Sequence, residues 1–193
     1  ESSNDRMRDQ LRGQGLLPTT EPYTALGFTQ VYGGGESTTP AVLGVTGDNA
    51  IVDWVQIELR DAGTPTALIA TRAALLQRDG DVVDIDGASA VSFRAGSGNY
   101  RVAVRHRNHL GAMSAAPIAL TTAPVGVDFS NPAFAAYGTD ARRLFNGRAL
   151  LWSGEVVRDA TLRYTGESND RDPQLQLIGG SVPTNVSAPG YYP

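Results

Sequence analysis

The segment AIVDWVQIELR, residues 50–60, decides the fold class of this chain. Its side chains alternate between two faces, which is the period of a β-strand. One face carries Ile51, Asp53, Val55, Ile57 and Leu59, and the other carries Val52, Trp54, Gln56 and Glu58. Because the face with Val55, Ile57 and Leu59 is the more apolar, we expect it to form the core. Trp54 is then expected at an edge or an interface.

The strand signal continues on both sides of this segment. Further strands are expected in residues 24–32, 66–77, 90–94, 100–107, 117–121 and 125–129, with acidic turns within 77–87. Residues 66–77 are rich in Ala and Leu, which a helix also accepts, but the turn residues around them favour an extended chain. About seven short strands at hairpin spacing predict a mainly β protein, a Greek-key β-sandwich of immunoglobulin or fibronectin III shape. The absence of Cys excludes a true antibody-type domain.

The two ends of the chain contain the same short sequence motif. Ser3-Asn4-Asp5-Arg6 recurs as Ser168-Asn169-Asp170-Arg171, Gly15 recurs as Gly180, and Pro18-Thr19 recurs as Pro183-Thr184, always at the same separation. Each copy predicts a short helical arm, in residues 3–12 and 168–178. The expected organisation is an N-terminal arm in 1–22, a sandwich in 23–130 and a C-terminal extension in 131–193. Within the extension we expect a polar helix or turn at 139–146 and an apolar strand pair at 149–157.

Composition narrows the class of protein. The net charge is −4 and all sixteen basic residues are Arg, scattered among acids, so we expect no nucleic-acid partner. No apolar run approaches the ~20 residues of a membrane span. Without Cys, neither a disulfide nor a Cys-bearing zinc site can form. The chain starts at Glu and has no signal-like stretch, which indicates a processed product or an excised portion.

Three groups of residues have the chemistry of metal ligands. Residues 159–172 gather carboxylates and amides around a Gly turn, as calcium requires, although a capped helix start explains the same residues. Four acids at 79–86 are interpreted as solvated hairpin turns. His106 and His109 could begin a zinc or copper site, but no third ligand is near in the sequence, so a role in fixing a loop is favoured.

No catalytic residue is assigned from the sequence. There is no Gly-x-Ser-x-Gly elbow, no Cys, and no His in a recognisable triad context. Paired carboxylates for glycoside hydrolysis stay an open alternative, because one sequence does not give the distance between acids. Aromatic residues expected at the surface, Tyr23, Tyr32, Trp152, Tyr191 and Tyr192, suit either sugar stacking or a protein interface.

Several blocks resemble a C-terminal region of large secreted, cell-surface bacterial proteins that are described as hemagglutinin-like or dockerin-like. The blocks are LRGQGLLPTTEPYTALGF (11–28), IVDWVQIELRD (51–61), RAALLQRDGDVVDIDG (72–87), RVAVRHRNHLGAM (101–113) and LRYTGESNDRDPQLQLIGGSVPTN (162–185). The resemblance implies an extracellular or cell-surface location and a non-catalytic β-rich module.

The same resemblance implies a calcium half-loop of the form D-x-N-x-D-G before the YTG sequence. The matching positions here are Glu155, Val157, Asp159 and Ala160, so only two acids remain and the Gly is replaced. The residues left to test as calcium ligands are Glu155, Asp159, Asp170 and Asp172.

These observations lead to a first hypothesis of a secreted structural module whose copies join end to end into a fibre or surface layer, with calcium as a candidate stabilising ion. The self-association residues expected in the arms are Met7, Leu11, Leu16, Leu17, Tyr23, Trp152, Leu175, Tyr191 and Tyr192. Whether the terminal copies meet within one chain or between chains stays open. The alternative is a carbohydrate-binding or adhesive module of a larger secreted protein, with surface glycans as partners. A hydrolase is the third hypothesis.

Overall fold

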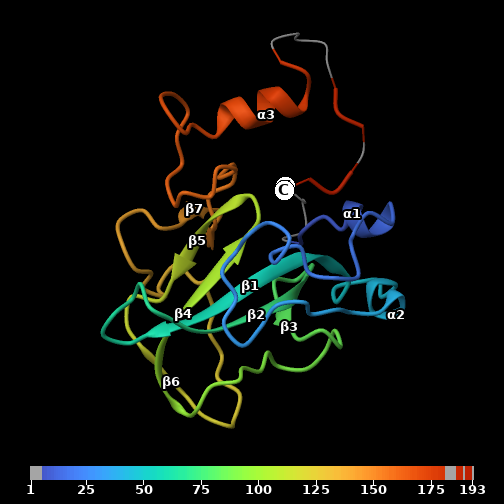
Figure 1. The fold of residues 1–193 in the computed structure, drawn as a ribbon. Coiled ribbons are helices and arrows are strands. Elements are labelled where there is room, and N and C mark those ends of the chain that lie inside the picture. Colours follow the sequence, from blue (N-terminus) through green and yellow to red (C-terminus); the bar gives the residue numbers. More distant parts are fainter. Residues whose placement is uncertain (1–5, 181–185, 189, 193) are drawn as a thin grey trace.

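In a computed structural model, which describes residues 6–180, 186–188 and 190–192, the chain is mainly β. Its centre is an antiparallel sheet of six strands (Figure 1). The strands are β1 Ile51–Asp61, β2 Leu68–Gln77, β3 Val82–Val83, β4 Gly98–His106, β5 His109–Met113 and β6 Ile118–Leu120. A hairpin of β7 Arg143–Phe145 and β8 Arg148–Leu150 lies outside this sheet. The helices are α1 Gln10–Gly13, α2 Pro40–Leu43 and α3 Arg171–Leu177.

The longest strand occupies the middle of the sheet. The strand order is β3-β2-β1-β4-β5, and β6 pairs with the first residues of β4, on the same side as β5. All pairings are antiparallel, and β1–β2, β2–β3 and β4–β5 follow one another in the chain. Short connections suffice for antiparallel neighbours. The expectation that residues 66–77 are extended is confirmed.

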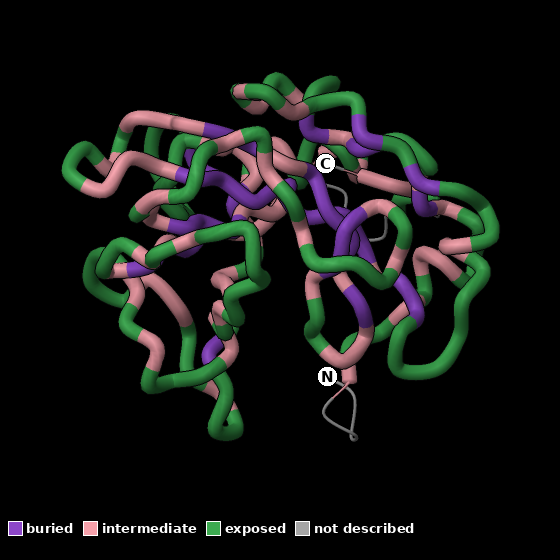
Figure 2. The backbone as a smooth tube through the Cα atoms, turned by 90° about the horizontal axis from the view of Figure 1, so that it is seen from below, coloured by how far each residue is buried: buried purple, intermediate pink, exposed green. Residues whose placement is uncertain are grey.

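Both faces of β1 are buried, which corrects the expectation that only one face forms the core. Trp54 and Gln56 are fully enclosed and Glu58 is only 3% exposed. A bulge between Ile51 and Asp53 shifts the register with β2, so Ile51 packs with Trp54 and not with Val55. Figure 2 shows that buried positions gather in the interior of the molecule, while the outer loops are exposed.

The two faces carry separate apolar clusters. Val55, Ile57 and Leu59 pack on one face with residues of β2, β4 and β5, and partly buried residues between 91 and 129 cover them. The other face is covered by the N-terminal segment. Leu17 and Tyr23 pack there against Trp54.

Polar contacts fix the N-terminal segment on the sheet. The Tyr23 hydroxyl donates to the Trp54 carbonyl at 2.7 Å, and the Trp54 indole Nε1 donates to the Pro18 carbonyl at 2.9 Å. Because both groups are buried, each bond satisfies a polar atom that water does not reach. The N-terminal segment is therefore part of the folded body.

The layers that cover the sheet are irregular chain, and the Greek-key sandwich is not confirmed. Strands were expected in residues 24–32, 90–94 and 125–129, and the structure has turns and irregular chain there. Gly27, Gly34 and Gly35 adopt positive φ, which interrupts a strand ladder. The predicted strand at 117–121 is present as β6.

The terminal copies share a local structure. Helix α1 and the corresponding part of α3 end before a glycine of positive φ, Gly15 at +67° and Gly180 at +85°. The N-terminal helix is shorter than expected, since residues 6–9 are not helical and 1–5 lie outside the described residues. Helix α2 was not expected; Thr39 caps it by accepting a hydrogen bond from the Val42 N–H.

The C-terminal extension differs in its strands from the expectation. The strand pair predicted in 149–157 and the polar helix or turn predicted in 139–146 are replaced by the β7–β8 hairpin. Asn146 and Gly147 form its two-residue turn, both with positive φ, which is the preferred Asn-Gly hairpin turn.

The N-terminal cover contributes to stability. We expect Leu17→Ala to lower the free energy of unfolding by about 2–3 kcal/mol, because the side chain fills the cluster beside Trp54. Urea unfolding followed by tryptophan fluorescence measures the change. Val45→Ala, at a position 42% exposed, is the matched control and should cost less than about 0.5 kcal/mol. Equal losses in the two variants would contradict a docked N-terminal segment.

Candidate functional site

A buried polar cluster lies where β1 begins and β4 ends. Its centre is the Asp53 carboxylate, which pairs with the Arg107 guanidinium and lies 3.2 Å from His106 Nε2. All three side chains are almost fully buried. Burial raises the pKa of Asp53, but the hydrogen bonds and positive charge of His106 and Arg107 outweigh it and hold that pKa below the usual value.

The same cluster binds the C-terminal segment to the sheet. The Tyr191 hydroxyl donates to Asp53 Oδ1 at 2.7 Å, and Arg107 Nε donates to the Tyr192 carbonyl at 2.7 Å. The Arg107 guanidinium also lies 4.0 Å from the centroid of the Tyr191 ring. One buried ion pair therefore links β1, the β4–β5 turn and residues 191–192.

The two histidines form a pair within the β4–β5 turn. Their Nδ1 atoms are 2.9 Å apart, and His109 Nδ1 is 2.8 Å from Asn108 Oδ1. Burial and the neighbouring charges of His106 and Arg107 lower the pKa of His109 to about 4. The structure favours the interpretation that these histidines fix a loop. In the part of the chain that the structure describes, no three His, Asp or Glu side chains group as metal ligands do.

The sequence contained one signal for this cluster. Asp53 is a carboxylate on a strand whose other residues on that face are apolar, and such a residue requires a partner. Its partners, His106 and Arg107, lie in a segment whose own residues indicate only a metal site or a loop contact. Their contact with Asp53 depends on the pairing of β1 with β4, which the sequence does not show.

The four residues predicted as calcium ligands lie in and beside the loop at 155–172. Asp170 accepts hydrogen bonds from the backbone N–H groups of Val156 at 2.7 Å and Arg163 at 2.8 Å. Burial raises the pKa of Asp170, but these backbone donors outweigh it, so the net pKa is lowered. Asp159 pairs with Arg163. These carboxylates already have protein donors.

The helix start explains the remaining acids of this loop. Asn169 Oδ1 accepts from the Asp172 N–H at 3.0 Å, and Asn169 Nδ2 donates to Asp172 Oδ2 at 2.9 Å. The capped helix start expected as one interpretation is thus present. Glu155 differs, because its Oε1 is buried and has no hydrogen-bond partner among the described residues. Burial and the charge of Asp170 raise its pKa.

The loop keeps a backbone conformation that suits glycine. Ala160 stands at the position where the resemblance expects Gly, and its φ is +64°; Arg158 has φ +65°. An L side chain in this left-handed region costs about 1–2 kcal/mol. Ala160 therefore holds a strained backbone conformation.

The residues predicted for self-association divide into three groups. Leu17 and Tyr23 are in the core of their own chain, and Leu11 and Tyr191 pack against that core. Leu16, Trp152 and Tyr192 are half-buried, and the Trp152 indole donates to the Asp140 carbonyl at 2.8 Å. Met7 and Leu175 are each 36% exposed.

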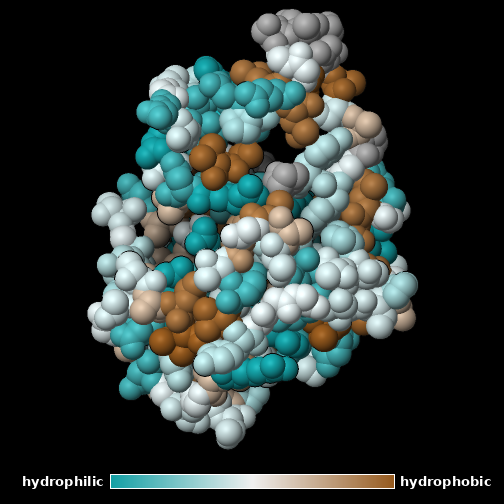
Figure 3. Space-filling view, viewed as in Figure 1, coloured by the Kyte–Doolittle hydropathy of each residue, from teal (hydrophilic) through white to brown (hydrophobic). Residues whose placement is uncertain are grey.

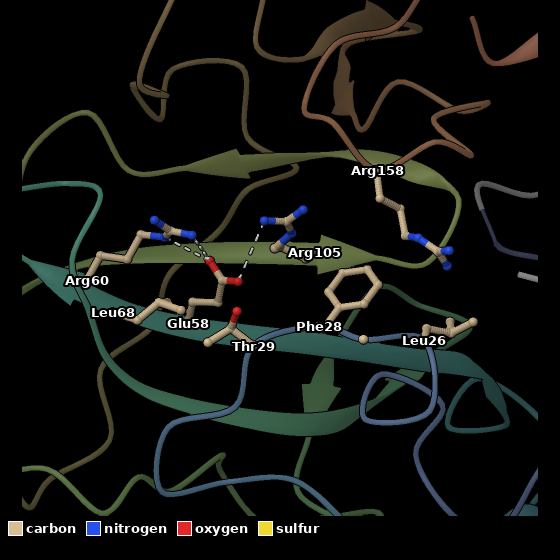
Figure 4. Close-up of a pocket in the computed structure, with 9 residues that line it drawn as sticks. Leu26, Phe28, Thr29, Glu58, Arg60, Leu68, Arg105 and Arg158 are labelled. Atoms are coloured by element: carbon tan, nitrogen blue, oxygen red, sulfur yellow. Dashed lines mark hydrogen bonds and ion pairs between the residues drawn. The ribbon is translucent and has the colours of Figure 1, made fainter. Parts of the chain in front are cut away.

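A hollow of about 230 Å³ lies where the N-terminal segment, the sheet and the C-terminal extension meet (Figure 4). Its polar and aromatic lining is Phe28, Thr29, Glu58, Arg60, Arg105 and Arg158. Arg60 Nη2 is 2.6 Å and Arg105 Nη1 is 3.8 Å from the Glu58 carboxylate. Sequence analysis missed this site, because its residues are far apart in the chain.

Comparison of this chain with protein-family models, curated proteins and solved structures finds no match. The resemblance to hemagglutinin-like or dockerin-like regions stays a prediction. No helix in the described ranges is long and apolar enough to cross a membrane.

The strained loop gives a test by substitution. We expect Ala160→Gly to raise the free energy of unfolding by about 1 kcal/mol, because glycine adopts positive φ without steric cost. Thermal and urea unfolding measure the change. Ala123→Gly, at an exposed loop position without positive φ, is the control and should be neutral or slightly destabilising. A loss of stability in Ala160→Gly would contradict the strain.

The histidine pair predicts a pH dependence of stability. The unfolded chain binds a proton at His109 near its ordinary pKa of 6.5, whereas the folded chain does so only near 4. The contribution of His109 is therefore complete above pH 6.5 and is lost as the pH falls toward 4. The loss is about 3 kcal/mol by linkage.

Unfolding free energy measured from pH 7.5 to 4 checks this expectation, with His109→Gln as the comparison. The variant should lack the part of the decline that His109 causes. An identical pH profile in the two proteins would show that His109 does not titrate differently on folding.

Proposed function

We propose that this chain is a non-catalytic structural module, located outside the cell or at its surface, whose copies associate end to end. The C-terminal extension is the surface that we assign to the contact. A head-to-tail contact that does not close generates a filament or a layer. The single observation that carries the proposal is that the two matching terminal segments of the chain pack differently.

The N-terminal copy is packed against its own chain. Leu11 of α1 contacts the cluster around Trp54, and the chain after the Gly15 turn places Leu17 in that cluster. Neither α1 nor α3 has a fully buried residue, but Leu175 and Leu177 of α3 are 36% and 53% exposed. A helical motif whose leucine packs on the body at one end, and whose leucines stay exposed at the other, supports a role in contacts between copies of the chain.

Exposed apolar side chains concentrate in the same extension. Of twelve exposed large apolar residues in the described ranges, seven lie between 144 and 186. They are Leu144, Leu150, Leu162, Tyr164, Leu175, Leu177 and Val186. Figure 3 shows hydrophobic side chains on the surface of the upper part of the molecule, where Figure 1 places α3. Apolar surface gathered in one region is typical of an interaction site.

Calcium remains a proposed stabilising ion of the association. Glu155 is the predicted ligand with an unpartnered buried oxygen, and it neighbours Asp170. A cation at this place would have to compete for the Asp170 oxygens with the backbone N–H groups that already donate to them. Light scattering with calcium and with chelator tests this part separately.

Self-association is measured by size-exclusion chromatography with light scattering over a concentration series. We expect the mass of the unmodified chain to rise with concentration. The double variant Leu175→Ser/Leu177→Ser should remain a monomer, because it removes apolar area from the exposed α3 surface.

The matched control is Val45→Ser/Val125→Ser, which removes two similarly exposed side chains from other loops. It should associate like the unmodified chain. A monomer at all concentrations would overturn the proposal. Growth that stops at a dimer would retain self-association but overturn the end-to-end arrangement.

Carbohydrate binding, as an adhesive module, is the second candidate function. The arginine-lined hollow of Figure 4 favours it, because it combines an aromatic ring with charged donors and acceptors at one concave place. Trp152, one of the five aromatic residues that the sequence offers for sugar stacking, lies outside this hollow.

A further inference from the structure

The hollow beside β1 contains more positive charge than its own carboxylate neutralises. Three guanidinium groups, of Arg60, Arg105 and Arg158, line it together with one carboxylate, Glu58. Glu155, the other acid near Arg105, does not line the hollow. An excess of cationic groups in a concave site attracts an anion.

The three arginines differ in how far their donors are used. Most donors of Arg60 are engaged: Nε donates to Glu58 Oε2 at 2.8 Å, Nη1 donates to the Pro65 carbonyl at 3.0 Å, and Nη2 lies 2.6 Å from Glu58 Oε2. Its role is to fix Glu58. It is therefore not free to bind a ligand.

Arg105 and Arg158 retain unused donors. Arg105 approaches Glu58 only at 3.8 Å and lies 5.2 Å from the centroid of the Phe28 ring. Arg158 Nη1 is buried and has no hydrogen-bond partner within the described residues. In Figure 4 the Phe28 ring lies between these two guanidinium groups. A buried guanidinium nitrogen without an acceptor is costly, and a ligand oxygen would satisfy it once the Arg158 side chain turns toward the hollow.

The rest of the lining indicates which kind of anion fits. Phe28 offers apolar area, as a sugar ring requires, and the Thr29 hydroxyl lies in the lining. Glu58 Oε1 has only distant donors, Gln56 Nε2 at 3.4 Å and Arg105 Nη1 at 3.8 Å. It can therefore accept a hydrogen bond from a ligand hydroxyl group. A ligand with both a carboxylate and hydroxyl groups satisfies the arginines and Glu58 together.

We propose that this hollow binds the carboxylate of a single acidic sugar residue, with Arg105 and Arg158 as the carboxylate ligands and Glu58 as a hydroxyl acceptor. The volume of about 230 Å³ lies below the ~300–1,000 Å³ of common small-molecule pockets, so the occupant is limited to one small residue. The inference rests on the second candidate function above, and it is independent of self-association.

Isothermal titration and amide chemical shifts with sodium glucuronate test the assignment on the full chain. We expect binding that weakens with added salt, and glucose should bind at least about tenfold more weakly because it lacks the charge. Arg105→Gln and Arg158→Asn should each reduce glucuronate affinity about tenfold. Asn is chosen at 158 because it tolerates positive φ.

Arg163→Gln is the matched control, because Arg163 lies on the same loop, pairs with Asp159 and does not line the hollow. It should bind glucuronate like the unmodified chain, and thermal unfolding should show that all variants are folded. N-acetylglutamate and sulfate are further probes. Equal affinity for either one would overturn the sugar assignment in favour of an acidic peptide or a plain anion.

The possible results distinguish a failure of the hollow as the binding site from a failure of sugar binding as the function. Equal affinities for glucose and glucuronate, lost in Trp152→Ala, would retain sugar binding and overturn the hollow as its site. Absence of binding by every probe at tens of millimolar would overturn both. Unchanged affinity in both arginine variants would overturn the assignment of the ligands.

Discussion

The burial of β1 on both of its faces is the constraint on which the rest of the structure depends. A central strand with Trp54 and Gln56 on one side and Val55 and Leu59 on the other needs two separate covers. This chain supplies them largely from irregular segments, the N-terminal segment on one face and the chain around 91–95 and Phe129 on the other. Irregular covers must satisfy their own backbone groups, which explains the hydrogen bonds from Tyr23 and Trp54 that join cover and sheet.

A second constraint is the buried Asp53–Arg107 pair. An isolated charge in this position would be strongly unfavourable, so each partner requires the other and the donors around them. The geometry uses this pair to connect elements that are far apart in sequence, since Tyr191 donates to Asp53 and Arg107 donates to the Tyr192 carbonyl. The sheet thus positions the end of the described chain through electrostatics as well as apolar packing.

The C-terminal extension between β7 and α3 follows different rules from the sheet. Its loop is organised by Asp170, whose carboxylate replaces backbone partners for Val156 and Arg163, and it contains residues of positive φ such as Arg158 and Ala160. Little apolar area is buried there, while Leu175 and Leu177 are exposed. Where this loop meets the sheet, Arg158 joins Arg105 and Phe28 in the lining of the hollow.

The sequence by itself determined the mainly β class, the strand in 50–60, the extended conformation of 66–77 and the matching helix ends at Gly15 and Gly180. These depend on local periodicity and on backbone preferences that neighbouring residues express directly. Tertiary structure decided that both faces of β1 are covered, which residues partner Asp53, and that Arg105 and Arg158 line one hollow. Such contacts depend on strand order and on the bulge at Val52, where one extra residue moves Ile51 to the other face. Alternation in one segment carries no information about what lies across the sheet, so a site built from three distant segments became visible only in the folded chain.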